Sequence, residues 1–203
     1  MKQIFFFRHG MTEANRKKLY CGTSDLPLCE EGRQELLRLK REFLEYYRPA
    51  EGCFSTPCLR TAETMKLLLG ETNPIWIPEF MECAFGEYEL HSYEELKSRP
   101  DYIAWILDES GTVSPPGGES RMEFAGRLKT GLERLLAREE STLAVACHGG
   151  VIANLMSMLF PEETVPGEDG TPRKKAFYDW QPGFGRGYLV TFSHGKPAGF
   201  QMR

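Results

Sequence analysis

The chain has 203 residues, of which 41% are hydrophobic and 27% charged, and its formal net charge at pH 7 is −4. A chain of this length can bury a sizeable hydrophobic core, and we expect one domain over residues 1–203. The negative net charge argues against nucleic acid or an anionic membrane surface as the main partner.

Cysteine spacing and the N-terminal residues bear on the cellular compartment. The six cysteines include no Cys-x-x-Cys pair and no histidine at a zinc-like spacing, so we expect reduced thiols and no bound metal. Only four consecutive apolar residues, 4–7, precede Arg8, which is too few for the core of a signal peptide or for a membrane span. The sequence therefore predicts a cytoplasmic protein.

The first predicted element is a buried strand over residues 4–7, a short run of bulky apolar side chains. Arg8, His9 and Gly10 follow it directly. In α/β sheets, ligands bind at the carboxyl ends of the strands, so Arg8 and His9 are candidate site residues.

A helix that covers the core is predicted over residues 30–47. Its apolar side chains recur near one face: Leu36, Leu37, Phe43, Leu44 and Tyr47. A short strand over residues 53–54 comes next, and a helix over residues 62–69 is closed by Gly70. Arg60 lies at the start of this second helix, just past a predicted strand.

Glu82 follows a third predicted strand, over residues 75–77. A long helix is then predicted over residues 119–138, because leucine and phenylalanine recur along one stripe. The loop before it, residues 109–118, is rich in proline, glycine and charge.

The strand predicted over residues 142–147 repeats the first pattern, because His148 and Gly149 follow it directly. Two imidazoles are thus expected to share one crevice. A helix over residues 149–160 would direct backbone N–H groups toward a ligand beside His148.

The chain closes with a hairpin over residues 186–202, after a segment at 161–175 that we expect to be a flap or a surface loop. The alternation of strands and helices predicts an α/β fold.

Two arginines, two histidines and a carboxylic acid, each just past a predicted strand, suit a phosphate ester. Arg8, Arg60 and His148 can supply positive charge to the dianion. A neutral His9 can attack phosphorus and form a phosphohistidine, and Glu82 can protonate the leaving alkoxide and then activate water. The sequence thus predicts phosphoryl chemistry without a metal or cofactor.

The motifs together resemble the histidine phosphatase superfamily, also called the phosphoglycerate mutase-like family. They occur in order along nearly the whole chain: Arg8-His9-Gly10-x-Thr12-x-x-Asn15, Gly22-x-x-Asp25-x-Pro27-Leu28, Ser55-x-Pro57-x-x-Arg60-x-x-x-Thr64, Glu82-x-x-Phe85-Gly86, Pro116-x-Gly118-Glu119-Ser120 and His148-Gly149-Gly150.

The resemblance implies a three-layer α/β/α sandwich with a mostly parallel central sheet and a C-terminal hairpin. It implies that Glu82 is the proton donor and that Asn15 contacts phosphate through its side-chain amide. Thr12, Thr23 and the Gly149 amide are further candidates for substrate binding.

Two positions depart from the family pattern. Cys29 stands where a threonine or serine usually precedes the first long helix, which predicts a weaker N-cap by about 1 kcal/mol. Leu90 stands where most members have glycine after an aromatic residue and glutamate. This replacement and the compact length look most like the alpha-ribazole phosphatase branch of cobalamin synthesis.

The sequence is compatible with four functions. We favour a phosphomonoesterase with a small-molecule substrate, for which alpha-ribazole 5′-phosphate is the first candidate. Its base would need apolar stacking partners, and six aromatic residues are candidates, with packing in the core or the C-terminal hairpin as the favoured alternative for any single one: Tyr20, Tyr88, Phe177, Tyr178, Trp180 and Phe184. The alternatives are a phosphoglycerate mutase, a sugar phosphatase of broad specificity and a non-catalytic relative that binds phosphorylated partners. The short stretch between Glu82 and Pro115 argues against a mutase, and the presence of both histidines argues against a non-catalytic relative.

Overall fold

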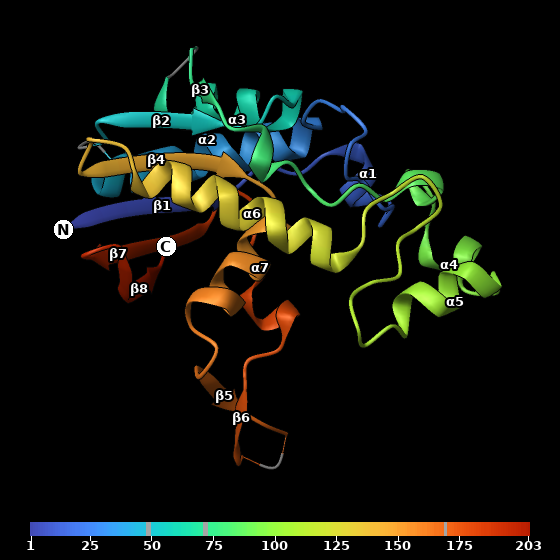
Figure 1. The fold of residues 1–203 in the computed structure, drawn as a ribbon. Coiled ribbons are helices and arrows are strands. Elements are labelled where there is room, and N and C mark those ends of the chain that lie inside the picture. Colours follow the sequence, from blue (N-terminus) through green and yellow to red (C-terminus); the bar gives the residue numbers. More distant parts are fainter. Residues whose placement is uncertain (48–49, 71–72, 169) are drawn as a thin grey trace.

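The computed structural model describes residues 1–47, 50–70, 73–168 and 170–203 (Figure 1), with no side-chain description at 43 and 45–47. Its central sheet has the strand order β3-β2-β4-β1-β7-β8. The strands are β1 Lys2–Arg8, β2 Gly52–Ser55, β3 Ile75–Trp76, β4 Thr142–Cys147, β7 Gly187–Ser193 and β8 Lys196–Met202. The first four are parallel, and β7 and β8 form an antiparallel hairpin beside β1. The predicted α/β fold is confirmed.

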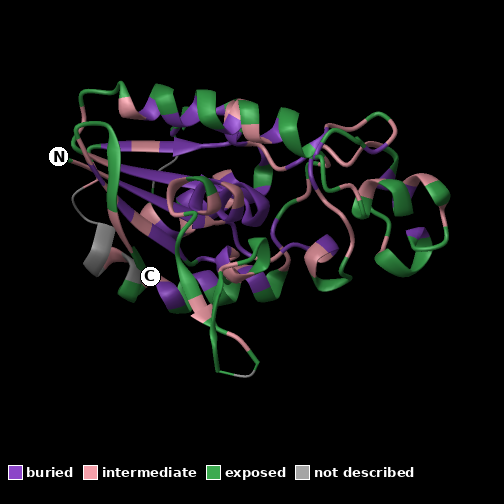
Figure 2. Ribbon diagram, turned by 60° about the horizontal axis from the view of Figure 1, so that its bottom comes forward, coloured by how far each residue is buried: buried purple, intermediate pink, exposed green. Residues whose placement is uncertain are grey.

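Helices cover both faces of the sheet, as the three-layer prediction requires (Figure 1). On one face lie α2 Glu30–Tyr47 and α3 Leu59–Leu69, and on the other lie α6 Arg121–Leu136 and α7 Gly149–Leu159. Strand β1 contributes side chains to the hydrophobic cores on both faces of the sheet, because successive side chains of a strand point to opposite faces. Phe5 and Phe7 pack with α2 and α3, whereas Phe6 packs with α6 and α7. Figure 2 shows the resulting burial along the sheet.

Helix α2 has the predicted bounds, but its buried face is narrower than predicted. Leu36 is fully buried, whereas the side chain of Leu37 is 54% exposed. Neighbouring residues on a helix lie about 100° apart, so only one of them can face the sheet. The prediction for Leu37 is wrong, and the side chains of Phe43 and Tyr47 lie outside the described residues.

Several short elements were not predicted. They are α1 Glu13–Arg16, α4 Tyr93–Leu96, α5 Pro100–Ile106 and the 3₁₀ turns η1 Pro78–Phe80, η2 Gly86–Tyr88 and η3 Phe177–Trp180. The segment at 161–175 contains a two-stranded hairpin, β5 Thr164–Pro166 and β6 Pro172–Lys174, which projects from the body (Figure 1). Within the described residues, no helix has the length and apolar character that crossing a membrane requires.

Candidate active site

His9 and His148 lie side by side at the carboxyl edge of the sheet. Strands β1 and β4 are parallel neighbours, and Arg8 lies opposite Cys147. The residues that follow them, His9 and His148, therefore lie opposite each other where the two strands end. The His9 N–H donates to the Cys147 carbonyl over 3.0 Å. The two imidazole centroids are 5.2 Å apart, and both side chains are buried.

The hydrogen bond of the His9 ring fixes which nitrogen is available. Nδ1 lies 2.7 Å from the Gly10 carbonyl, which can only accept, so Nδ1 carries the proton. The lone pair is then on Nε2. Burial holds the pKa of His9 well below 6.5, and the positive charge of Arg60 lowers it further. The neutral imidazole is the form that a nucleophile needs.

His148 is neutral for the same reasons, since burial and the neighbouring Arg60 hold its pKa well below 6.5. Its Nδ1 accepts from Arg60 Nε over 3.2 Å, because an arginine N–H can only donate. Its Nε2–H therefore faces the Thr56 hydroxyl at 2.9 Å. In this arrangement His148 contributes hydrogen bonds, and not the positive charge expected from the sequence.

Arg60 enters the site from the first turn of α3, and its side chain is fully buried. Its guanidinium also donates to two backbone carbonyls, to Ser24 over 2.8 Å and to Gly22 over 2.6 Å. The helix that carries it has no cap from Cys58. Instead Asp25 accepts the Leu59 N–H over 2.7 Å, which ties the same loop to the helix start.

Arg8 lies at the end of β1, and its side chain has a buried N–H donor without a partner among the described residues. Its Nη1 donates to the Pro182 carbonyl over 3.0 Å, and its guanidinium lies 4.0 Å above the Phe184 ring. Its Nε is buried and has no hydrogen-bond partner within the described part of the chain. A Cβ at Gly149 would lie 3.0 Å from this nitrogen, so only glycine leaves the approach open.

Glu82 lies in the segment after η1, and its carboxylate contacts the N-terminus of α7, which begins after His148. Its carboxylate accepts the Gly150 N–H over 2.8 Å and the Cys83 N–H over 3.0 Å. Burial raises the pKa of Glu82 above 4.5, although these N–H donors and the charges of Arg60 and Arg8 act in the opposite direction. Burial outweighs the other effects.

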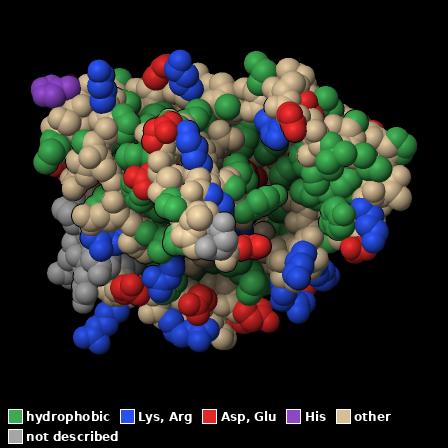
Figure 3. All heavy atoms as spheres, turned by 90° about the horizontal axis from the view of Figure 1, so that it is seen from below, with side chains coloured by type: hydrophobic (Ala, Val, Ile, Leu, Met, Phe, Trp, Pro, Cys, Tyr) green, Lys and Arg blue, Asp and Glu red, His purple; other side chains and the backbone are tan. Residues whose placement is uncertain are grey.

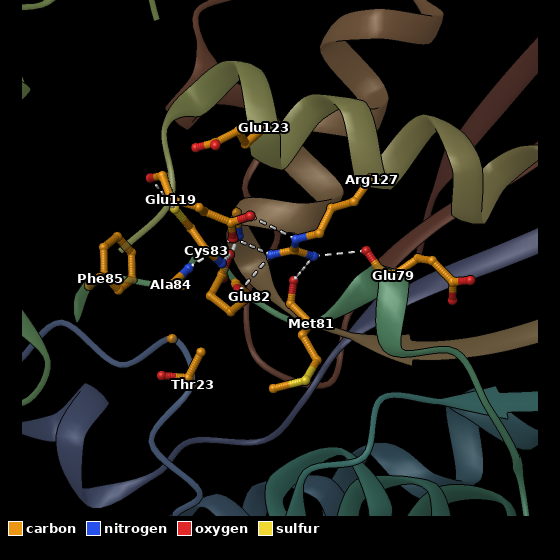
Figure 4. Close-up of polar contacts among 12 residues, drawn as sticks. Thr23, Glu79, Met81, Glu82, Cys83, Ala84, Phe85, Glu119, Glu123 and Arg127 are labelled. Atoms are coloured by element: carbon orange, nitrogen blue, oxygen red, sulfur yellow. Dashed lines mark hydrogen bonds and ion pairs between the residues drawn. The ribbon is translucent and has the colours of Figure 1, made fainter. Parts of the chain in front are cut away.

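A residue that the sequence analysis missed holds the Glu82 segment in place (Figure 4). Arg127 of α6 donates to the carbonyls of Glu79, Met81 and Glu82 over 2.8, 2.6 and 2.9 Å. Its guanidinium also pairs with Glu119, whose carboxylate accepts the Ala84 N–H over 2.9 Å. The available signal was the spacing: Arg127 lies two helical turns after a motif glutamate.

Thr12 and Asn15 make hydrogen bonds to each other. The Asn15 side-chain oxygen accepts from the Thr12 N–H over 3.0 Å, and the Thr12 hydroxyl accepts from the Asn15 N–H over 3.3 Å, so the pair caps α1.

Thr23 is exposed, with its hydroxyl 3.4 Å from Glu89. Among the described residues, no three His, Cys, Asp or Glu side chains gather as a metal ligand set.

The six aromatic candidates divide into three pairs. Tyr88 and Trp180 are fully buried in the cores, so the prediction that they offer stacking surfaces is wrong. Phe184 lies next to His9 with centroids 6.2 Å apart. Tyr20 packs on Phe85, which is three residues after Glu82. Phe177 and Tyr178 are exposed and pack against each other, with ring centroids 5.3 Å apart. Figure 3 shows further apolar side chains gathered over the α4–α5 end of the molecule.

Residues 4–166 match the family model of the histidine phosphatase superfamily, branch 1. This chain belongs to the histidine phosphatase superfamily. Its relatives in the superfamily are phosphatases or mutases, enzymes that act through a phosphohistidine, and the protein is an enzyme of this kind.

Two curated members of the superfamily are equally similar to the chain. The adenosylcobalamin/alpha-ribazole phosphatase of Salmonella typhimurium (strain LT2) is 31% identical over 162 residues, 77% of this chain and 79% of the relative. The 2,3-bisphosphoglycerate-dependent phosphoglycerate mutase of Rhizobium etli is 31% identical over 165 residues, 76% of this chain and 78% of the relative.

Two solved structures share the fold of this chain. The alpha-ribazole phosphatase from Shigella flexneri matches with a TM-score of 0.80 at 22% identity, over 99% of this chain and 94% of that one. The phosphoglycerate mutase from Thermus thermophilus matches with a TM-score of 0.69 at 28% identity, over 98% of this chain and 97% of that one. Because a structure described as a mutase is matched over nearly its whole length, the compact length alone does not distinguish the two activities.

Proposed function

We propose that the protein hydrolyses a small phosphate monoester through a phosphohistidine at His9. The observation that carries the proposal is the His9 ring, whose Nδ1–H is bound to the Gly10 carbonyl while Nε2 keeps its lone pair. Arg8 and Arg60 lie close enough to lower the pKa of this imidazole, and the same positive charges would bind the phosphoryl oxygens. The buried Nε of Arg8 would gain a partner there.

In the first step, Nε2 of His9 attacks phosphorus and the bond from phosphorus to the ester oxygen breaks. Glu82, whose pKa is raised above 4.5 by burial, gives its proton to the departing alkoxide. In the second step, the Glu82 carboxylate takes a proton from water as the water oxygen attacks phosphorus. The bond from phosphorus to Nε2 breaks, and inorganic phosphate leaves. Since arginines supply the positive charge, hydrolysis of an aryl phosphate is expected to continue in saturating EDTA.

For the substrate we propose alpha-ribazole 5′-phosphate. The name of the Salmonella relative suggests it, and two rings support it: Tyr20, which packs on Phe85, and the exposed Tyr178. A flat base needs an aromatic or apolar surface, whereas phosphoglycerate carries a carboxylate that needs further cations. The Tyr178 side chain is 79% exposed, which leaves its ring available to a ligand.

A comparison of kcat/KM tests the substrate directly, because specificity is a difference in transition-state binding. We expect alpha-ribazole 5′-phosphate to be hydrolysed much faster than 2- and 3-phosphoglycerate are interconverted. Tyr178→Ala should lower kcat/KM for the ribazole ester about tenfold and leave glycerol phosphate hydrolysis unchanged. Tyr178→Phe keeps the ring and is the matched control.

The second candidate is a phosphoglycerate mutase, which the identity to the Rhizobium etli enzyme favours. Mutase turnover equal to or faster than ribazole ester hydrolysis would replace our proposal with this one. Slow hydrolysis of all these esters at similar rates would point to a phosphatase of broad specificity.

A further inference from the structure

The carboxylate of Glu89 lies in a ring of backbone donors beside the site. It accepts the N–H groups of three consecutive residues: Gly22 at 3.0 Å, Thr23 at 2.9 Å and Ser24 at 3.3 Å. The Phe85 N–H adds a fourth bond at 3.2 Å. Successive N–H groups that converge in this way form an anion-binding concavity, and here a side chain of the same protein fills it.

The loop bound by Glu89 is the one that holds Arg60. The peptide group between Gly22 and Thr23 makes both contacts: its N–H donates to Glu89 over 2.9 Å, and its C=O accepts from Arg60 over 2.6 Å. In a trans peptide these two groups point in opposite directions. A negative charge on the N–H side and a positive charge on the C=O side both stabilise the peptide dipole. The two side chains are therefore coupled through one peptide group without touching each other.

Close packing keeps the loop in this position. A Cβ at Gly22 would lie 1.8 Å from the Cys83 carbonyl, so the loop lies directly against the Glu82 segment. The backbone beside Glu89 is also paired, because Leu90 N–H donates to the Tyr20 carbonyl over 2.8 Å. Glu89 thus joins the segment that carries the proposed acid to the loop that orients the proposed phosphate ligand.

We infer that Glu89 is a positioning residue that holds the Arg60 guanidinium in place for the phosphoryl group, through the Gly22–Thr23 peptide. The inference rests on the proposed role of Arg60. Glu89→Gln would remove the negative charge. It would also place an amide NH₂ group among the backbone N–H donors, and an NH₂ group cannot accept their hydrogen bonds. The loop carbonyls would then hold Arg60 less firmly, and anion binding should weaken.

The test is calorimetric titration of inorganic phosphate into wild type, Glu89→Gln, Arg60→Lys and the double variant. We expect Glu89→Gln to weaken phosphate binding about tenfold in the wild-type background and less than twofold in the Arg60→Lys background. Such non-additivity would show that Glu89 acts through Arg60. A residue with only a structural role would give the same loss in both backgrounds, which would overturn the inference.

Glu87→Gln is the matched control, because Glu87 lies two residues away and its carboxylate pairs with Arg99 at 3.1 Å. It loses the same charge and should bind phosphate as wild type does; an equal loss in Glu87→Gln and Glu89→Gln would also overturn the inference. If Glu89→Gln does not fold, the same cycle with Glu89→Asp decides, again by whether its loss depends on Arg60. Unchanged phosphate binding in Arg60→Lys would contradict the proposed role of Arg60 instead.

Discussion

The N–H of Gly150 donates to Glu82 Oε2 over 2.8 Å, so the helix that begins after His148 holds the carboxylate of the proposed acid. The contact needs glycine, because a Cβ at position 150 would lie 2.4 Å from Glu82 Oε1. The partial positive charge of the helix N-terminus also favours the carboxylate form that the second chemical step requires. The second histidine motif therefore positions the acid as well as its own imidazole.

Gly150→Ala should displace Glu82 and slow hydrolysis of an alkyl phosphate about 10²-fold, the lower end of what a general acid contributes. The measurement is kcat for glycerol phosphate and p-nitrophenyl phosphate in the variant and the wild type. Gly126→Ala is the control, since a Cβ there has no neighbour within 4 Å. It should leave kcat unchanged, and wild-type rates in Gly150→Ala would refute the steric argument.

Glu82→Gln should slow esters with poor alkyl leaving groups far more than esters with good aryl leaving groups. A general acid matters in proportion to the charge that builds on the leaving oxygen, and it typically contributes about 10²–10⁴-fold. Rates across a series of esters with increasing leaving-group pKa give the slope for each enzyme. Equal losses along the series would make Glu82 a structural or phosphate-orienting residue.

The pH dependence should follow from the shifted pKa values of His9 and Glu82. The acid must be protonated, and because burial raises the pKa of Glu82, activity persists above the ordinary carboxyl pKa of 4.5 and falls as pH rises through the raised value. His9 must be neutral, and because its pKa lies well below 6.5, activity is lost only when pH falls below that lowered value. The profile of kcat/KM for an alkyl ester should lose its alkaline limb in Glu82→Gln. An alkaline limb that survives this substitution would assign it to another group.

Leu90→Gly should stabilise the protein, because Leu90 has a φ of 60°. A side chain in the left-handed region costs about 1–2 kcal/mol, which glycine avoids. The Leu90 side chain is 43% exposed, so its removal forfeits only part of a buried contact. Denaturant unfolding should show a gain of about 1 kcal/mol after the entropy cost of glycine is included. A loss of stability would show that the packing of Leu90 outweighs the backbone strain.

The sequence predicts the parts of the site that depend on strands. His9, His148 and Arg8 directly follow apolar runs, and parallel strands bring such residues to one edge. Arg127 and Glu89 do not follow strands, and most of their partners are backbone groups of irregular segments, so the strand pattern does not reveal them. The same limit explains the wrong assignments of Tyr88 and Trp180, since an aromatic residue near a motif does not show which way it points.

The central claim is that the Nε2 lone pair of His9 attacks phosphorus. The test is brief incubation with p-nitrophenyl phosphate at neutral pH, because a good aryl leaving group departs without the Glu82 proton. An alkaline quench then keeps an acid-labile P–N bond intact for peptide mass spectrometry and ³¹P NMR. We predict one phosphoryl group on Nε2 of His9, present in wild type, accumulated in Glu82→Gln and absent in His9→Ala. A phosphoryl group on a serine or cysteine, or none on His9 even in Glu82→Gln, would contradict the account.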